Sequence, residues 1–182
     1  MSRLYFVRLL LTCAVLFLVL QRLYVWVRSN HEVFLNDRLN GVPSVWLINQ
    51  LAPDENVVAA DGRLVNGRGG DVNIKKGCEG FEVAILLVSV LAVYPMAWRR
   101  RLLGILLGVL LIYGLNIIRI VSLYYLWSYH PRVFELFHLT VWQAIIILLA
   151  WLFFIVWIDR AGNAAAVPLP EPEPEQEAPH DA

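Results

Sequence analysis

The chain has 182 residues, of which 59% are hydrophobic and only 16% are charged, and its formal net charge is zero. This composition lies outside the range of ordinary soluble domains and indicates an integral membrane protein. The balanced charge argues against a nucleic-acid partner, because phosphate binding needs a basic surface.

Four apolar runs are each long enough to cross a bilayer core of about 30 Å. They lie within residues 4–27, 81–98, 102–127 and 139–158. The first run follows Arg3 and Arg8 as in a signal peptide, but no small-residue cleavage site comes after it, so residues 1–28 are interpreted as a retained helix. The sequence therefore predicts an all-α membrane protein with about four transmembrane helices.

Residues 29–77 form a predicted extracytoplasmic insertion before the second helix. Between 31 and 51 the apolar residues suggest short amphipathic helical pieces, broken at the sequence GVP at 41–43. Between 56 and 74 the pairs Asp-Gly, Asn-Gly and Gly-Gly separate short apolar runs, which predicts a small β-hairpin or meander.

The rest of the chain divides into a core and a tail. Residues 78–160 are predicted to form a three-helix transmembrane core. Residues 161–182 are rich in proline, glutamate and alanine, which predicts a disordered acidic tail.

Basic residues in short loops set the predicted orientation. Three arginines at 99–101 link the second and third runs, and Arg3 and Arg8 flank the first. Such residues favour the cytoplasmic side of a membrane. With four spans both termini are then cytoplasmic, whereas the insertion and the loop SYHPRVFE lie outside.

This topology brings three side chains of types that can take part in catalysis to the outer leaflet. Cys78 opens the second helix, Arg119 lies late in the third, and His138 stands at the head of the fourth. A helix N-terminus favours a cysteine thiolate, whereas Glu79 and Glu82 oppose it, so the sign of the pKa shift stays open.

Each of these residues also has a structural interpretation. An arginine in hydrocarbon is costly and needs a partner, so Glu82 could form a purely structural ion pair with Arg119. Asn116, three residues before Arg119, could orient it on the same helical face. His130 is a competitor for the role of His138. No closely paired ligands indicate a metal site, and no cofactor is expected.

Three motifs together resemble the exosortase/archaeosortase family. They are Cys-Glu-Gly at 78–80, Asn-Ile-Ile-Arg at 116–119 and His138, and the similarity covers about residues 71–157. The short chain resembles the compact branch of the family, of which exosortase H is an example. Glu79 stands where many members have serine or threonine.

The resemblance implies a membrane-embedded cysteine transpeptidase. Cys78 would attack a scissile carbonyl and form a thioester, Arg119 would stabilise the thiolate or the oxyanion, and His138 would transfer protons. The implied substrate is an exported protein that ends in a recognition motif, a membrane helix and a basic tail. The recognition motif, the acceptor nucleophile and the oligomeric state are left open, as is hydrolysis by water in place of transfer.

The implied location is the bacterial inner membrane, with the active site at the extracytoplasmic face. A rival interpretation from a different class makes the chain a non-enzymatic membrane assembly protein, in which Glu82 and Arg119 form a structural pair and Cys78 is inert.

Overall fold

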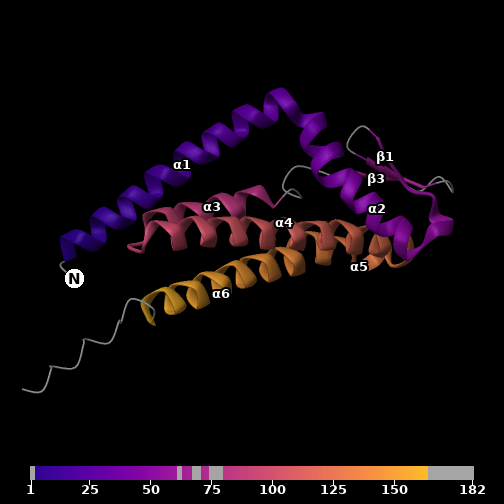
Figure 1. Cartoon of the computed structure of the whole chain (residues 1–182). Helices are drawn as coiled ribbons and strands as arrows, with labels where there is room; N and C mark the ends of the chain where they lie inside the picture. The colour runs from indigo at the N-terminus through magenta and orange to yellow at the C-terminus, as the bar shows by residue number, and fades with distance from the viewer. Residues whose placement is uncertain (1–2, 61–62, 67–70, 74–79, 164–182) are drawn as a thin grey trace, which may run out of the picture.

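The computed structural model describes residues 3–60, 63–66, 71–73 and 80–163, and its helices and strands are shown in Figure 1. The helices are α1 (Arg3–Val33), α2 (Val42–Leu51), α3 (Phe81–Val93), α4 (Trp98–Tyr129), α5 (Pro131–Leu136) and α6 (Trp142–Asn163). Two π-helical stretches, η1 (Phe34–Gly41) and η3 (Phe137–Val141), and a 3-10 turn, η2 (Pro53–Glu55), connect them. Cys78, Glu79 and most of the predicted tail lie outside the described residues.

Three helical stretches of the described chain are long and apolar enough to cross a membrane: Arg3–Glu32, Trp98–Tyr129 and Pro131–Arg160. The last combines α5, η3 and α6. The predicted second span corresponds to α3, which has 13 residues. At roughly 1.5 Å per residue it measures about 20 Å, less than a hydrocarbon core of about 30 Å. The prediction of four full spans is therefore not confirmed.

The early end of α3 has a local cause. Tyr94, which follows the helix, adopts an extended conformation with φ −62° and ψ 134°. The next residue is Pro95, and a residue that precedes proline is driven out of the helical region by a steric clash with the proline ring. The apolar run continues past this point in the sequence, but the helix does not.

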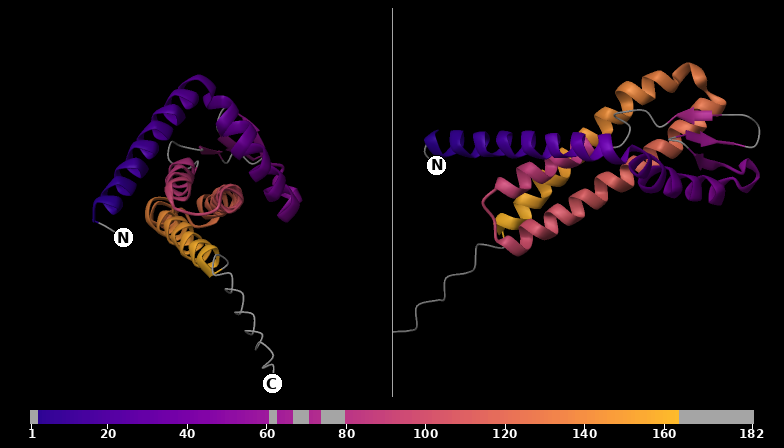
Figure 2. Two further views of the ribbon diagram at one scale, coloured as in Figure 1. Left: turned by 60° about the vertical axis from the view of Figure 1, so that its left-hand side comes forward. Right: turned by 90° about the horizontal axis from the view of Figure 1, so that it is seen from above.

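Helices α3, α4 and α6 pack side by side as a bundle (Figures 1 and 2). The buried side chains between them are Leu87, Leu91, Ile112, Ile146 and Ala150. Close packing depends on two glycines of α4. A Cβ atom at Gly104 would overlap the indole of Trp157, and one at Gly108 would contact Leu87 and Phe153. Small residues four apart commonly permit such close approach between membrane helices.

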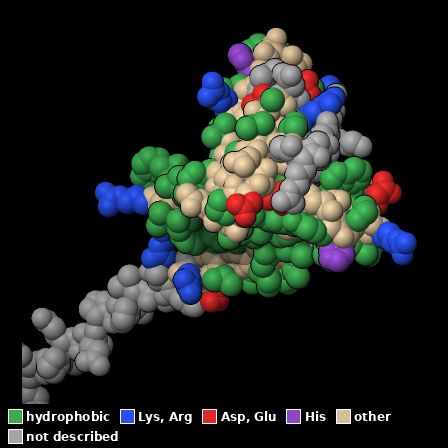
Figure 3. All heavy atoms as spheres, turned by 90° about the vertical axis from the view of Figure 1, so that its right-hand side faces the viewer, with side chains coloured by type: hydrophobic (Ala, Val, Ile, Leu, Met, Phe, Trp, Pro, Cys, Tyr) green, Lys and Arg blue, Asp and Glu red, His purple; other side chains and the backbone are tan. Residues whose placement is uncertain are grey.

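The surface of the bundle is apolar. Many large hydrophobic side chains are exposed on α1, α4 and α6, among them Leu106, Leu148 and Trp151. Figure 3 shows hydrophobic side chains over much of the visible face, with most charged side chains near its margins. Because lipid tails are as apolar as these side chains, their exposure fits a protein whose solvent is the bilayer.

The insertion between α1 and α3 carries a small antiparallel sheet. Its strands are β1 (Val58–Ala60), β2 (Arg63–Val65) and β3 (Asp71–Asn73), in the order β1-β2-β3. Leu64 pairs with Ala59 on one side and Val72 on the other. The expected hairpin or meander is thus a three-stranded meander. The break expected at 41–43 is not there, because Gly41 is helical, with φ −64° and ψ −57°, and η1 continues directly into α2. The helix is instead interrupted at His31, which has φ −135° and ψ 34°.

The insertion packs on the second half of α4. Ile48 of α2, Val57 and Leu64 form one buried cluster with four α4 residues: Ile117, Ile120, Val121 and Tyr124. Polar contacts extend this interface, because Tyr124 and Tyr129 donate hydrogen bonds of 2.6 and 2.9 Å to the buried carboxylate of Glu55. The insertion is therefore part of the folded core.

The molecule has two distinct ends (Figures 1 and 2). The start of α1, the link between α3 and α4, and the end of α6 lie toward one end, whereas α2, the sheet and α5 lie toward the other. The described residues nearest to Cys78 in the sequence, those that begin α3, approach α4 between these two ends.

Candidate active site

Gly80 fixes the start of α3 against α4. Its backbone has φ +69°, a left-handed conformation that costs little only for glycine. A Cβ atom at this position would also lie 3.2 Å from the side chain of Asn116. The carbonyl of Gly80 accepts the first hydrogen bond of the helix, from the backbone N–H of Ala84 at 3.2 Å. Cys78, two residues earlier, lies outside the described residues.

The two polar residues of the Asn-Ile-Ile-Arg motif are buried. Asn116 is 0% exposed and Arg119 is 3% exposed, although both belong to a spanning helix. Their spacing of three residues places them on one face of α4. That face is turned toward the other helices of the bundle and toward the insertion, which shields a charged side chain from lipid.

Arg119 is joined to the head of the last spanning stretch. Its Nη2 donates a hydrogen bond of 3.1 Å to the backbone carbonyl oxygen of His138, in η3. The half-buried imidazole of His138 stacks on Phe134, with ring centroids 5.4 Å apart and planes 9° apart. π-Helical turns such as η3 often occur at functional sites. By contrast, His130 is exposed and lies at the junction of α4 and α5.

A small pocket lies at the start of α3, and its volume of about 10 Å³ leaves room for roughly one water molecule. Helices α1, α3, α4 and α6 all contribute to it, and it is lined by Tyr24, Gly80, Phe81, Glu82, Val83, Arg119, Gln143 and Ile146. Tyr24 and Phe81 close one side, with ring centroids 5.3 Å apart. The pocket therefore joins the buried guanidinium to the turn that follows Cys78 in the sequence.

Glu82 and Arg119 share this pocket but do not form the ion pair considered above. The side chain of Glu82 is exposed, and within the part of the chain that the structure describes no ion pair joins the two residues. Glu82 lies in the first turn of α3, where a negative charge is favourable next to the helix dipole.

Gln143 is a pocket residue that the sequence interpretation missed. It is the only amide or charged side chain between 142 and 158, within an otherwise apolar spanning stretch. A polar side chain in such a stretch is costly and usually faces a bundle interior or a wet cavity. That isolation in the sequence is the signal that could have identified it.

These groups suit the chemistry of acyl transfer. A guanidinium held by the backbone in a pocket with little water can stabilise negative charge that develops on a carbonyl oxygen. An amide such as that of Gln143 can both donate to and accept from a peptide group. The histidine at the head of η3 supplies a side chain able to transfer protons.

A comparison with known families agrees with this chemistry. The family model described as transmembrane exosortase matches residues 7–158, which include all the motif positions discussed above. No curated protein and no solved structure matches the chain.

Proposed function

The chain belongs to the transmembrane exosortase family, and we propose that it cleaves C-terminal sorting signals of exported proteins through a covalent intermediate on Cys78. Family membership makes it a membrane transpeptidase of protein sorting. The nucleophile, the other site residues and the form of the substrate are our proposal.

The proposed reaction has two halves. In the first, the thiolate of Cys78 attacks the scissile carbonyl, the C–N bond breaks, and the leaving amine takes a proton from His138, which leaves a thioester. In the second, an acceptor nucleophile gives its proton to His138 and attacks the thioester, which releases the transferred product and restores the thiolate. Arg119 stabilises the oxyanion in both halves.

The observation that carries this proposal is the placement of Arg119. Its side chain is 3% exposed, lines a pocket with Gly80 and donates a hydrogen bond to the backbone at His138. Burying a guanidinium in a membrane helix costs free energy, and an apolar side chain could pack at the same position without that cost. An oxyanion that forms during the reaction gives this charge a function at the pocket.

The proposed substrate is an exported protein that ends in a recognition motif, a membrane helix and a basic tail. The site lies at the extracytoplasmic face of the bacterial inner membrane, with both chain termini in the cytoplasm. The arrangement of the helices supports this orientation, because α3 returns the chain toward the end that carries the start of α1 (Figure 1). The three arginines at 99–101 begin α4 at that same end.

The non-enzymatic alternative has less support. It requires the burial of Arg119 to be explained by a structural pair with Glu82, and the described residues hold no such pair. Hydrolysis uses the same residues as transfer and differs only in whether water or another nucleophile resolves the thioester.

The testing experiment measures processing of a co-expressed substrate that carries a C-terminal helix and basic tail. Wild type is compared with Cys78→Ala and Cys78→Ser at equal membrane abundance, and Cys13→Ala, the other cysteine of the chain, is the matched control. We expect cleavage to be lost in both Cys78 variants and kept in the Cys13 variant. Cleavage that persists without Cys78 would refute the mechanism. The mass of the new C-terminus separates transfer from hydrolysis.

A further inference from the structure

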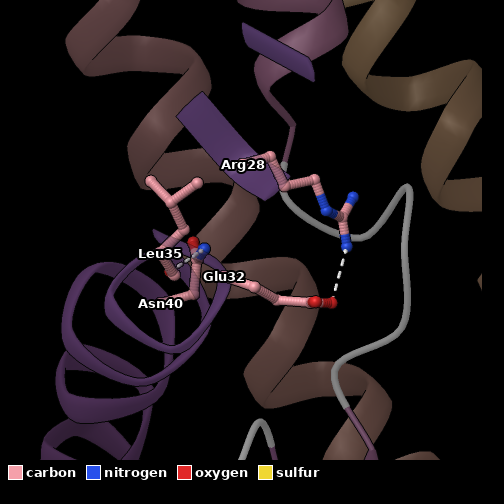
Figure 4. Close-up of polar contacts among 4 residues, drawn as sticks. All are labelled: Arg28, Glu32, Leu35 and Asn40. Carbon is pink, nitrogen blue, oxygen red and sulfur yellow. Dashed lines mark hydrogen bonds and ion pairs between the residues drawn. The ribbon is translucent and has the colours of Figure 1, made fainter. Parts of the chain in front are cut away.

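Two buried amides join the insertion to the motif face of α4. Asn40 of η1 and Asn116 of α4 are 76 positions apart in the sequence, and both are 0% exposed. The Nδ2 of Asn116 donates a hydrogen bond of 3.1 Å to the Oδ1 of Asn40. In turn, the Nδ2 of Asn40 donates 2.9 Å to the carbonyl oxygen of Leu35, as Figure 4 shows.

The bond to Leu35 decides which way round the Asn40 amide lies. Because the Nδ2 of Asn40 is used by that carbonyl, its Oδ1 is the atom presented to α4. Asn116 must therefore donate from its own Nδ2, since only the nitrogen of a side-chain amide can donate a hydrogen bond. One backbone carbonyl in η1 thereby fixes the orientation of two side chains.

The orientation of Asn116 matters at the start of α3. With its nitrogen directed to Asn40, the rest of its side chain lies against Gly80, and its Cβ, Cγ and Oδ1 are each 3.2 Å from the position of a Cβ atom there. Within the described residues this Oδ1 is buried and accepts no hydrogen bond. A buried acceptor without a donor lowers the stability of the folded protein, so stability alone does not account for this arrangement of Asn116.

η1 is also held in place by a second bond from the same face of α4. The hydroxyl of Tyr113 donates a hydrogen bond of 2.6 Å to the carbonyl oxygen of Leu39. Tyr113, Asn116 and Arg119 are spaced three residues apart, so each is a neighbour of the next on the surface of the helix. Adjacent residues of η1 thus contact two positions of the row that leads to Arg119.

From this geometry we propose that Asn40 is a positioning residue of the active site, which acts through Asn116 and touches no reacting group itself. It holds the side chain of Asn116 against the Gly80 turn and so sets the start of α3 relative to Arg119. This inference rests on the proposed function. It gives the insertion a part in the reaction, through a residue outside the three sequence motifs.

Three variants separate positioning from simple stabilisation. Asn40→Leu has nearly the same size and removes both hydrogen bonds. Asn40→Asp, which burial keeps in the neutral acid form, keeps an acceptor for Asn116 and an O–H donor for the carbonyl of Leu35. Asn49→Leu is the matched control, because Asn49 lies in the same insertion and forms two 2.9 Å hydrogen bonds with the backbone of Val57. Asn49→Leu removes two part-buried hydrogen bonds of the insertion without touching Asn116.

The measured quantity is the rate of substrate cleavage per folded molecule, with folding followed by thermal unfolding in detergent. We expect Asn40→Leu to be roughly tenfold slower than wild type, since one hydrogen bond is worth up to about tenfold. The loss persists when the substrate is overproduced, because positioning acts on the bound complex. Asn40→Asp stays within about threefold of wild type, and Asn49→Leu keeps the wild-type rate although it unfolds at a lower temperature.

With these results, the cleavage rate depends on whether residue 40 offers a hydrogen-bond acceptor to Asn116, and it does not depend on the stability of the insertion. A wild-type rate in Asn40→Leu, or an equal loss in Asn49→Leu, would overturn the inference while the proposed function stands. A wild-type chain that leaves the substrate intact would overturn the proposed function and this inference with it. If Asn40→Leu does not accumulate, Asn40→Ser replaces it with the same expectation, because serine is too short to reach Asn116.

Discussion

The guanidinium of Arg119 is held by the backbone of η3, through the 3.1 Å hydrogen bond from its Nη2 to the carbonyl oxygen of His138. Because the acceptor is a backbone atom, this contact does not depend on the side chain at 138. The position of the charge in the pocket and the identity of the proton-transferring residue can therefore be tested separately.

Arg119→Lys tests the position of the charge. Lysine keeps the charge but lacks the planar array of donors, so it cannot bind the His138 carbonyl and a developing oxyanion in the same geometry. We expect cleavage to fall by about a hundredfold, as for the loss of an oxyanion donor. Arg38→Lys, at an exposed arginine of η1, is the control and should cleave at the wild-type rate. Equal rates in the two variants would remove Arg119 from the mechanism.

Alanine substitutions at the two outer histidines test the proton-transfer role. His138→Ala leaves the backbone bond to Arg119 in place, so we expect it to lose cleavage by roughly a hundredfold or more without loss of folded protein. His130→Ala, at an exposed junction, should retain cleavage. The measurement is substrate processing at equal membrane abundance. The reverse pattern would assign the role to His130.

Glu82→Gln tests the structural-pair alternative. The carboxylate is exposed and forms no ion pair with Arg119 in the described chain, so we expect the free energy of unfolding to change by less than about 0.5 kcal/mol. A buried pair would behave differently, because removing one partner costs about 3–5 kcal/mol. Thermal unfolding in detergent distinguishes the two. A large loss of stability would support the non-enzymatic interpretation.

Gly80→Ala tests the turn that begins α3. Alanine at φ +69° is strained by about 1–2 kcal/mol, and its Cβ would press on Asn116 at 3.2 Å. We expect a lower unfolding temperature together with slower cleavage. Gly114→Ala, in the same helix as Asn116, has nothing within 4 Å of its added Cβ and should leave both readouts unchanged or slightly raise stability. Matching behaviour of the two variants would show that the turn has no special role.

Gln143→Leu tests the pocket residue on α6. Leucine removes a polar group from a spanning helix, so we expect stability to be kept or raised while cleavage falls by roughly tenfold. Thr140→Val, at an exposed polar residue of η3 that does not line the pocket, is the control. If Gln143→Leu cleaves its substrate at the wild-type rate, Gln143 has no role in binding or catalysis.

The sequence alone determined the membrane character and the family. These depend on composition and on short motifs, whereas the break expected at the GVP sequence is absent, because Gly41 stays helical between η1 and α2. The early end of α3 is equally local, because it follows from Pro95, but the hydropathy of the run concealed it and led to an expected fourth full span. The role of Cys78 remains a prediction.

Only the tertiary structure decided which polar groups meet. The bond from Arg119 to the His138 carbonyl, the Asn40–Asn116 pair and the inclusion of Gln143 in the pocket join residues from different elements. Hydrophobic periodicity shows that a helix has a buried face, but not which helix covers it or how far the two are shifted along their axes. In this protein those shifts are set by close packing at Gly104 and Gly108 and by the insertion seated on α4.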